Sequence, residues 1–324
     1  MNIDRVADML AARDASTWET PIQDPEFRKR RTREAPVFAN INLLGRCNVD
    51  CYFCLGKDLD NIFGAREDTR THFSKWARFE EFLAGIRSAG IQRVYVTGQN
   101  TDALLYRHLS ELIDYLQASG LSTGFRTNGY LFNRPENLAI AQQTRRNVGV
   151  SIHTLDPETN WTIMRRRDIP DWRVILPQIP RLRVSVVLGR HNEGQFWSLM
   201  EFLVEFPNIA YVQVRRICTD TREAFLRPDV GAYERVFQEV SAKHPVVARF
   251  YDAEVFNLLG KEVCFWRTVK TAIGSWNYYT DGTVNKGYFV IEGYAQETLA
   301  CMFPADPLVK VIPLSGYWRE RYKP

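Results

Sequence analysis

The sequence predicts an α/β fold, a partial (βα)6 barrel with a small C-terminal α+β cap. From Val37 onward, short apolar runs alternate with segments whose apolar residues recur at helical spacing. Such alternation is typical of a parallel sheet with helices outside, and right-handed crossovers curl that sheet into a full or partial barrel. After Asp252 the alternation stops and aromatic residues become frequent. A chain of 324 residues, of which 45% are hydrophobic, is long enough to bury a core of this size.

The strands are predicted from short apolar runs bounded by turn signals. Six of them form the barrel: Val37–Leu44, Arg93–Thr97, Ser122–Thr127, Val148–His153, Leu182–Leu188 and Ile209–Arg216. Val246–Tyr251 is a candidate for one further strand.

The helices are predicted between these strands from apolar residues at i, i+3 and i+4. The first carries such residues from Trp76 to Ile86, with Gly90 as its stop signal. The others are Asp102–Ala118, Pro135–Arg145, Pro157–Met164, Asp171–Gln178, Gln195–Phe206 and Val230–Ala242.

This pattern divides the chain into three parts. Residues 1–36 form a polar N-terminal arm, residues 37–252 form the barrel, and residues 253–324 form a C-terminal region that covers one face of the barrel and shapes a substrate pocket. Within the last part, Asp281-Gly282 is a hairpin signal between Trp276–Thr280 and Thr283–Val284.

Composition and charge exclude several classes of protein. The apolar runs are strand-sized, far below the ~20 residues that a membrane-spanning helix needs. The first ten residues lack the apolar segment of a secretory signal, so we expect a cytoplasmic protein without a membrane partner. The net charge is +4, which does not by itself imply nucleic acid. The basic run Arg28–Arg33 can contact phosphates, but we interpret it as a solvated segment.

Three of the six cysteines lie within eight residues. Cys47, Cys51 and Cys54 have the spacing Cys-x3-Cys-x2-Cys, immediately after the first predicted strand. Clustered cysteines in a cytosolic chain favour a metal or catalysis over disulfides. A zinc site usually pairs Cys-x2-Cys with a second pair, which is missing here, although His72 is a conceivable fourth ligand. Three thiolates on one loop can instead bind three irons of a cubane cluster and leave the fourth iron open.

The cysteine motif, with an aromatic residue before the last cysteine, resembles that of the radical S-adenosylmethionine (SAM) enzymes. The resemblance covers about Val37 to Arg216, and the later strand ends are similar to the branch that includes the molybdenum-cofactor enzyme. It implies a radical SAM barrel in which Cys47, Cys51 and Cys54 ligate a [4Fe–4S] cluster. The open iron would chelate the amino and carboxylate groups of SAM.

The same resemblance implies contacts to SAM at the strand ends. Phe53 would lie beside the adenine. Thr97, Gly98 and Gln99 occupy the turn that holds the SAM amino group, although this chain lacks the acid and the proline of the family's Gly-Gly-Glu-Pro turn. The further positions are Asn128 in a Thr-Asn-Gly turn, Ser151 near the ribose or carboxylate, Leu188 at the end of the fifth strand, and Arg215 near the adenine.

Other polar residues at the strand ends are candidates for catalysis or substrate binding. The candidates for catalysis are Cys218, His153 and Arg126. Arg126 and Arg166 can bind a carboxylate or phosphate bidentately, and His153 and His191 can serve as acid–base groups or polar contacts. Cys218, Cys264 and Cys301 also raise the question of an auxiliary cluster. We interpret them as free cysteines because they are not grouped.

The resemblance implies an enzyme that cleaves SAM to methionine and a 5'-deoxyadenosyl radical, which abstracts hydrogen from a substrate. We expect a small molecule of cofactor, nucleoside or natural-product biosynthesis, with flavodoxin or ferredoxin as the one-electron donor. Modification of a ribosomal peptide is the alternative. Two readings from other classes are a zinc-stabilised nucleic-acid-binding protein and a degenerate barrel that binds SAM or a cluster without chemistry.

Overall fold

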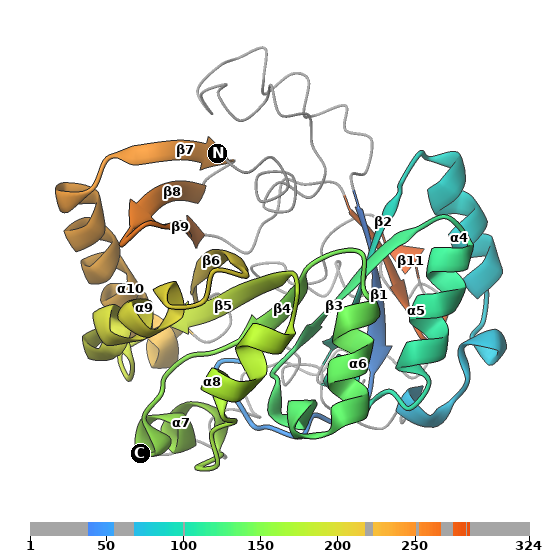
Figure 1. Cartoon of the computed structure of the whole chain (residues 1–324), viewed down its shortest axis with the longest axis horizontal. Helices are drawn as coiled ribbons and strands as arrows, with labels where there is room; N and C mark the ends of the chain where they lie inside the picture. Colours follow the sequence, from blue (N-terminus) through green and yellow to red (C-terminus); the bar gives the residue numbers. More distant parts are fainter. Residues whose placement is uncertain are drawn as a thin grey trace.

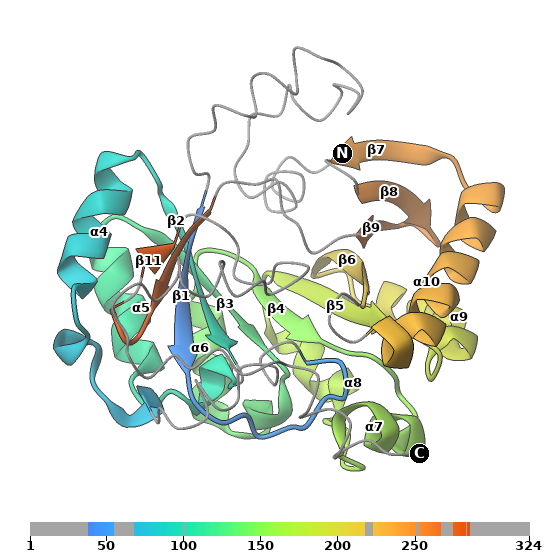
Figure 2. The same ribbon diagram turned by 180° about the vertical axis from the view of Figure 1, so that it is seen from behind.

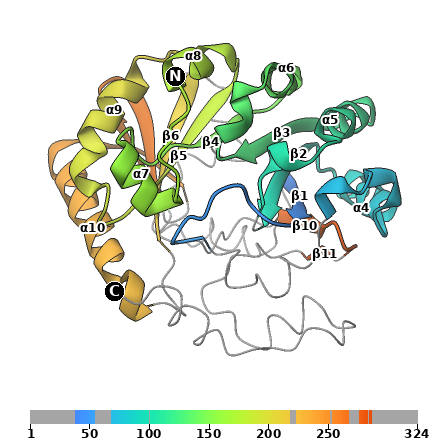
Figure 3. The same cartoon turned by 90° about the horizontal axis from the view of Figure 1, so that it is seen from below.

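The strands of the chain form a single curled sheet (Figures 1 and 3). The computed structural model describes residues 38–54, 68–99, 101–217, 223–250, 253–266, 275–282 and 284–285. Within these residues, eleven strands are paired in the order β11-β10-β1-β2-β3-β4-β5-β6-β9-β8-β7. The sheet curves into an open barrel, with β11 and β7 at its two edges.

The centre of the sheet consists of the six predicted barrel strands. Each is parallel to its neighbour and follows it in the sequence, which confirms the predicted βα series. Their bounds are β1 (Phe38–Leu44), β2 (Arg93–Gln99), β3 (Ser122–Thr127), β4 (Val148–Ser151), β5 (Leu182–Leu188) and β6 (Ile209–Arg216).

Most of the helices cover the outer face of this sheet, whereas α7 lies beside the loop that follows β1 (Figure 3). The α-helices are α4 (Phe79–Ser88), α5 (Leu109–Ala118), α6 (Pro135–Gln143), α7 (Pro157–Met164), α8 (Trp172–Ile175), α9 (Phe196–Val204) and α10 (Glu223–Lys243). Short 3-10 helices are η3 (Asp68–Arg70), η4 (Phe73–Lys75), η5 (Ala103–Leu105), η6 (Tyr130–Asn133), η7 (Leu176–Gln178) and η8 (Glu193–Gln195). The main hydrophobic core lies between the helices and the sheet. In the described residues, no helix has both the length and the apolar composition to cross a membrane.

One predicted helix is divided in two. The segment Asp102–Ala118 forms η5 and then α5, separated by Tyr106 to His108. The Asp102 side chain caps η5 by accepting a hydrogen bond from the backbone N–H of Leu104 at 2.9 Å. The apolar spacing continued through the break, so periodicity alone did not reveal it.

The C-terminal region was expected to cover the barrel, but its described strands extend the sheet at both edges (Figure 2). On one side, β9 (Lys261–Trp266) is parallel to β6 and pairs with β8 (Ala253–Leu258). On the other, β10 (Ser275–Tyr279) is parallel to β1. The predicted hairpin is confirmed, because β11 (Val284–Asn285) is antiparallel to β10. Whether Asp252 is a domain boundary stays a prediction.

The strand predicted at Val246–Tyr251 exists as β7 (Val246–Phe250) but does not continue the parallel series. It lies at the far edge and is antiparallel to β8. The next two strands form a hairpin, in which the turn between β8 and β9 contains Gly260 with φ of 82°. That hairpin places β9 beside β6, where Phe265 packs 5.7 Å from the ring of Phe237 on α10.

Candidate active site

The loop after β1 forms one wall of a cavity of about 230 Å³ at the carboxyl ends of the strands. Functional side chains gather at this end of parallel barrels. The cavity brings together eleven of the residues that the sequence singled out: Cys47, Cys51, Phe53, Cys54, Thr97, Gly98, Arg126, Asn128, Ser151, His153 and Arg215.

The cysteine loop is held by the end of helix α7. The backbone N–H of Asp50 donates to the carbonyl of Met164 at 3.0 Å, and that of Tyr52 donates to the carbonyl of Ile163 at 3.1 Å. Arg165 ends the helix in the left-handed conformation, with φ of 58°. Carbonyls in the last turn of a helix have no partner inside the helix, so they are free to accept these bonds.

A buried tyrosine makes the second attachment of the loop. The hydroxyl of Tyr52 donates to Asp229 Oδ1 at 2.7 Å, and the backbone N–H of Arg190 donates to the same oxygen at 3.0 Å. Burial and the charge of Asp229 raise the pKa of Tyr52, so it stays a neutral donor. Gly189 allows this approach, because a Cβ there would lie 2.6 Å from Asp229 Oδ1.

The first cysteine is tied to the turn after β3. Asn128 Nδ2 lies 3.7 Å from Cys47 Sγ and donates to Asn48 Oδ1 at 2.8 Å. Burial, followed by the charge of Asp102, raises the pKa of the Cys47 thiol to about 12. Without a cation this thiol is therefore protonated at neutral pH, and a bound metal would favour its thiolate form. Three thiols on one loop facing a cavity fit the three protein ligands of a cluster that has one open iron.

The end of β2 requires glycine at position 98. A Cβ there would lie 2.1 Å from the carbonyl oxygen of Thr101, a distance that no side chain tolerates. The Thr101 hydroxyl donates to the carbonyl of Arg46 at 3.0 Å, which joins the segment after β2 to the cysteine loop. Glycine at this position therefore makes room for the backbone of Thr101 and Asp102, and Thr97 and Gly98 both line the cavity.

Sequence reasoning missed Asp102, which also lines the cavity. Both of its carboxylate oxygens are occupied: Oδ1 accepts from Leu104 N and the Thr127 hydroxyl, at 2.9 and 2.8 Å, and Oδ2 accepts from Asn128 N at 2.6 Å. This carboxylate joins the turns after β2 and β3. Its position before an apolar run is a helix-capping signal that could have identified it.

His153 is a buried, neutral member of the cavity wall. It is 4% exposed, and its Nδ1 accepts a hydrogen bond from Val187 N at 3.1 Å, which places the proton of the neutral ring on Nε2. Burial lowers its pKa to about 4. Its ring makes an edge contact with Phe53 at 5.2 Å, so the two predicted residues lie together.

Some predicted residues lie elsewhere. The side chain of Leu188 is fully buried in the hydrophobic core, and Gln99 donates to Asn42 Oδ1 at 3.0 Å, so neither side chain lines the cavity. Cys218, like Cys301, falls outside the described residues. Cys264 is buried on β9.

The other polar candidates support the cysteine loop from outside or lie apart from it. Arg166 donates to the carbonyl of Asn48 at 3.3 Å and pairs with Asp168. The ring of His191 packs 5.4 Å from that of Tyr52. His72, the conceivable fourth zinc ligand, hydrogen-bonds Glu111 at 3.1 Å on the surface and does not line the cysteine cavity.

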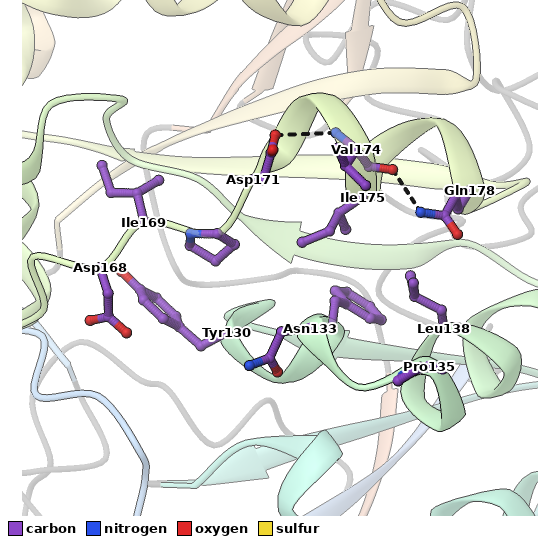
Figure 4. Close-up of a pocket in the computed structure, with 12 residues that line it drawn as sticks. Tyr130, Asn133, Pro135, Leu138, Asp168, Ile169, Asp171, Val174, Ile175 and Gln178 are labelled. Atoms are coloured by element: carbon purple, nitrogen blue, oxygen red, sulfur yellow. Dashed lines mark hydrogen bonds between the residues drawn. The ribbon is translucent and has the colours of Figure 1, made fainter.

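A second cavity of about 530 Å³ lies between α6 and α8 (Figure 4). It is larger than the cysteine cavity but shares no lining residue with it. Its walls include Leu138, Ile169 and Ile175, and Asp171 is occupied in capping α8 through Val174 N at 3.3 Å. Cavity size alone therefore does not identify the site; the convergence of thiols and strand-end polar groups does.

Comparison with curated proteins finds two GTP 3',8-cyclases. That of Aquifex aeolicus (strain VF5) is 26% identical over 127 residues, which cover 39% of this chain and 38% of the cyclase. That of Microcystis aeruginosa is 28% identical over 142 residues, covering 42% and 40%. The match thus spans less than half of each relative.

Solved structures with a similar fold include Streptococcus suis SuiB bound to S-adenosylmethionine. It has a TM-score of 0.54 and 16% identity, over 84% of this chain and 67% of SuiB. SuiB bound to its precursor peptide SuiA gives 0.54 and 14%, over 86% and 67%. At this identity the likeness concerns the fold.

The family model described as the radical SAM superfamily matches residues 41–203, half of the chain. The matched span contains the cysteine loop and strands β2 to β5. This protein is therefore an enzyme of the radical SAM superfamily, whose members use a [4Fe–4S] cluster and S-adenosylmethionine.

Proposed function

We propose that Cys47, Cys51 and Cys54 hold three irons of the cluster and that the enzyme acts on a small molecule. The observation that carries this proposal is the convergence of the three thiols with the ends of β2 to β6 on one cavity. When bound and reduced, the cluster supplies an electron for reductive cleavage of SAM to a radical that abstracts hydrogen.

Different residues of the cavity bind different parts of SAM. The backbone of Thr97 and Gly98, which line the cavity, offers carbonyls to the SAM amino group. Asn128 and Ser151 supply polar contacts, and Phe53 offers an aromatic face or edge to the adenine. Arg215 lines the cavity near the end of β6 and would lie near the adenine.

A small-molecule substrate is favoured by the two curated relatives, which are named for cyclisation of GTP. They also favour the molybdenum-cofactor-enzyme-like branch over other branches. Because the match covers less than half of each relative, the proposed substrate class includes cofactor, nucleoside and natural-product precursors.

Modification of a peptide is the second candidate, suggested by SuiB bound to SuiA. We further propose a flavodoxin or ferredoxin as electron donor and a cytoplasmic location.

The test is low-temperature EPR of the anaerobically reconstituted, dithionite-reduced enzyme with and without SAM. The proposal expects a [4Fe–4S]⁺ signal that SAM changes. Cys51→Ala should lose the signal, whereas Cys264→Ala, which removes a buried thiol on β9, should keep it. Iron and zinc are counted in the same samples.

The outcomes separate the competing readings. Zinc without iron would support a zinc-stabilised protein. A cluster whose signal SAM leaves unchanged would support a degenerate barrel. For the substrate class, formation of 5'-deoxyadenosine is then compared in the presence of nucleotides and of short peptides.

A further inference from the structure

Two histidines and a glutamate meet at the start of α5, and none of them lines the cysteine cavity. His72 Nε2 lies 3.1 Å from Glu111 Oε2, and His108 Nδ1 lies 3.3 Å from Glu111 Oε1. The centroids of the two imidazole rings are 4.8 Å apart. One nitrogen or oxygen atom of each residue lies within 4.8 Å of those of the other two. The three side chains therefore bring donor atoms for a metal ion close together.

Two separate segments supply these side chains. His108 is the N-cap of α5 and Glu111 lies in its first turn, so the spacing of three residues brings both to one side of the helix. His72 is the N-cap of η4 and lies 39 residues before Glu111. The hydroxyl of Tyr106 donates to the carbonyl of Thr71 at 3.1 Å and holds the two segments together. The fold therefore positions the cluster before any ion binds. Helix α5 lies on the outer face of the sheet (Figure 3).

The ring of His72 is oriented by its neighbours. It stacks on the ring of Phe73 with the centroids 4.3 Å apart, and Phe73 belongs to the main hydrophobic core. Its Nδ1 lies 2.7 Å from Ser74 Oγ and accepts from Ser74 N at 3.2 Å, which leaves Nε2 facing Glu111. In metal sites the second nitrogen of a ligating histidine usually has such a hydrogen-bond partner. With a metal at Nε2, the proton of the ring would lie on Nδ1, where the Ser74 hydroxyl oxygen can accept it.

The carboxylate of Glu111 is paired with imidazoles instead of a fixed cation. Among the described residues, both of its oxygens are in contact with the histidines, and no lysine or arginine forms an ion pair with it. Other exposed glutamates differ, since Glu81 pairs with Arg78 and Glu205 pairs with Arg173. A neutral imidazole offers a lone pair to a metal. Two imidazoles and one carboxylate thus supply three ligands and one negative charge for a divalent cation.

This donor set favours zinc over magnesium and calcium. Mg²⁺ and Ca²⁺ take oxygen ligands, whereas imidazole suits zinc and other transition metals. Two histidines and one glutamate form a tetrahedral zinc site when water takes the fourth position, with ligand atoms about 3.3 Å apart. The separations of up to 4.8 Å shorten to this value through rotation of the side chains. These side chains have room to rotate, because those of His72 and Glu111 are 32% and 61% exposed.

We propose that His72, His108 and Glu111 bind one Zn²⁺ ion, with water as the fourth ligand, at a metal site separate from the cysteine loop. The ion links the N-terminal end of η4 to the first turn of α5. It thereby restrains residues 101–108, a segment that includes Asp102 on the wall of the cysteine cavity. The role of the ion is structural. This site goes beyond the proposed function and does not depend on it.

The test is isothermal titration calorimetry of the anaerobically reconstituted, desalted enzyme with zinc chloride. We expect saturable binding of one equivalent, and metal analysis of the same samples should find zinc beside an unchanged iron content. His72→Gln and His108→Gln should each weaken binding about tenfold or more, since even the hydrogen-bond partners of metal ligands contribute that much. His244→Gln, which removes a histidine that packs against Trp197 outside the cluster, should leave binding unchanged.

Variants of the glutamate distinguish coordination of zinc from a general effect of charge. Glu111→Gln should weaken binding about tenfold or more, whereas Glu111→His should keep it, because a third imidazole replaces the carboxylate as ligand. Glu239→Gln is the matched control, since it removes an exposed carboxylate that pairs with Lys243 outside the cluster. Magnesium chloride in excess should not displace the zinc.

Three results would overturn the zinc site: no saturable binding in the wild type, equal binding in the wild type and His108→Gln, or binding that Cys51→Ala abolishes and His108→Gln leaves intact. The last result would assign the zinc to the cysteine loop. EPR on the same samples keeps the two proposals distinct. A SAM-sensitive cluster without histidine-dependent zinc binding rejects only the zinc site, whereas histidine-dependent zinc binding without a SAM-sensitive cluster rejects only the proposed function.

Discussion

His153 makes the stability of the protein dependent on pH in a direction that the structure fixes. Burial lowers the pKa of this imidazole from 6.5 to about 4. Between these two values the unfolded chain binds a proton that the folded chain does not, so stability falls as pH falls through this range. The full difference corresponds to about 3 kcal/mol, of which about 2 kcal/mol is lost by pH 5.

The measurement is urea unfolding of the cluster-free chain at pH 7.5 and pH 5, for the wild type and His153→Gln. The variant should be less stable at pH 7.5 by about 1 kcal/mol, because the hydrogen bond to Val187 N is perturbed. Between pH 7.5 and pH 5, however, the free energy of unfolding of the variant should fall by about 2 kcal/mol less than that of the wild type. Because both chains keep every other titrating group, the difference isolates His153. His244→Gln controls for the loss of an imidazole. Equal losses in the wild type and His153→Gln would refute the reasoning.

Three further substitutions test other contacts of the site and sheet. Gly98→Ala should keep the cluster but lose the effect of SAM on its EPR signal, because the Cβ would lie 2.1 Å from Thr101 O; an unchanged SAM effect would contradict the tight turn. Tyr52→Phe should cost about 1 kcal/mol in urea unfolding, because it removes the bond to Asp229; a cost near zero would show that this bond does not hold the loop. Lys261→Met should cost about 1–3 kcal/mol, since its buried Nζ donates to two backbone carbonyls at 3.0 Å; no cost would argue against this attachment of β9.

The barrel could be predicted because its strands are short, apolar and separated by helices of regular periodicity. The spacing of Cys47, Cys51 and Cys54 indicated the cluster directly, since thiolate ligands must come from cysteine. Most of the strand-end residues were found for a general reason: parallel strands bring their carboxyl ends to one edge.

What the sequence did not reveal depends on contacts between distant segments. Nothing local to Lys261–Trp266 indicates that this strand pairs with β6, because the pairing and the contact of Phe265 with Phe237 join segments that are distant in the sequence. The sequence around Asp102 shows only a helix-capping signal. Its hydrogen bonds with Thr127 and Asn128 join the end of β2 to the end of β3, which the sequence does not reveal. A SAM contact was predicted at Leu188 because this residue ends the fifth strand. The alternation of side chains along the strand, however, directs its side chain into the core.

The attachments of the cysteine loop also set an order of events during synthesis. Cys54 leaves the ribosome more than a hundred residues before Ile163 and Met164, whose carbonyls hold the loop, and Asp229 follows later still. Until α7 and α10 have been synthesised, the loop that carries the three thiols lacks the hydrogen bonds that fix its conformation. The conformation of the cysteine loop is therefore complete only after Asp229 has been synthesised, which is 175 residues after Cys54.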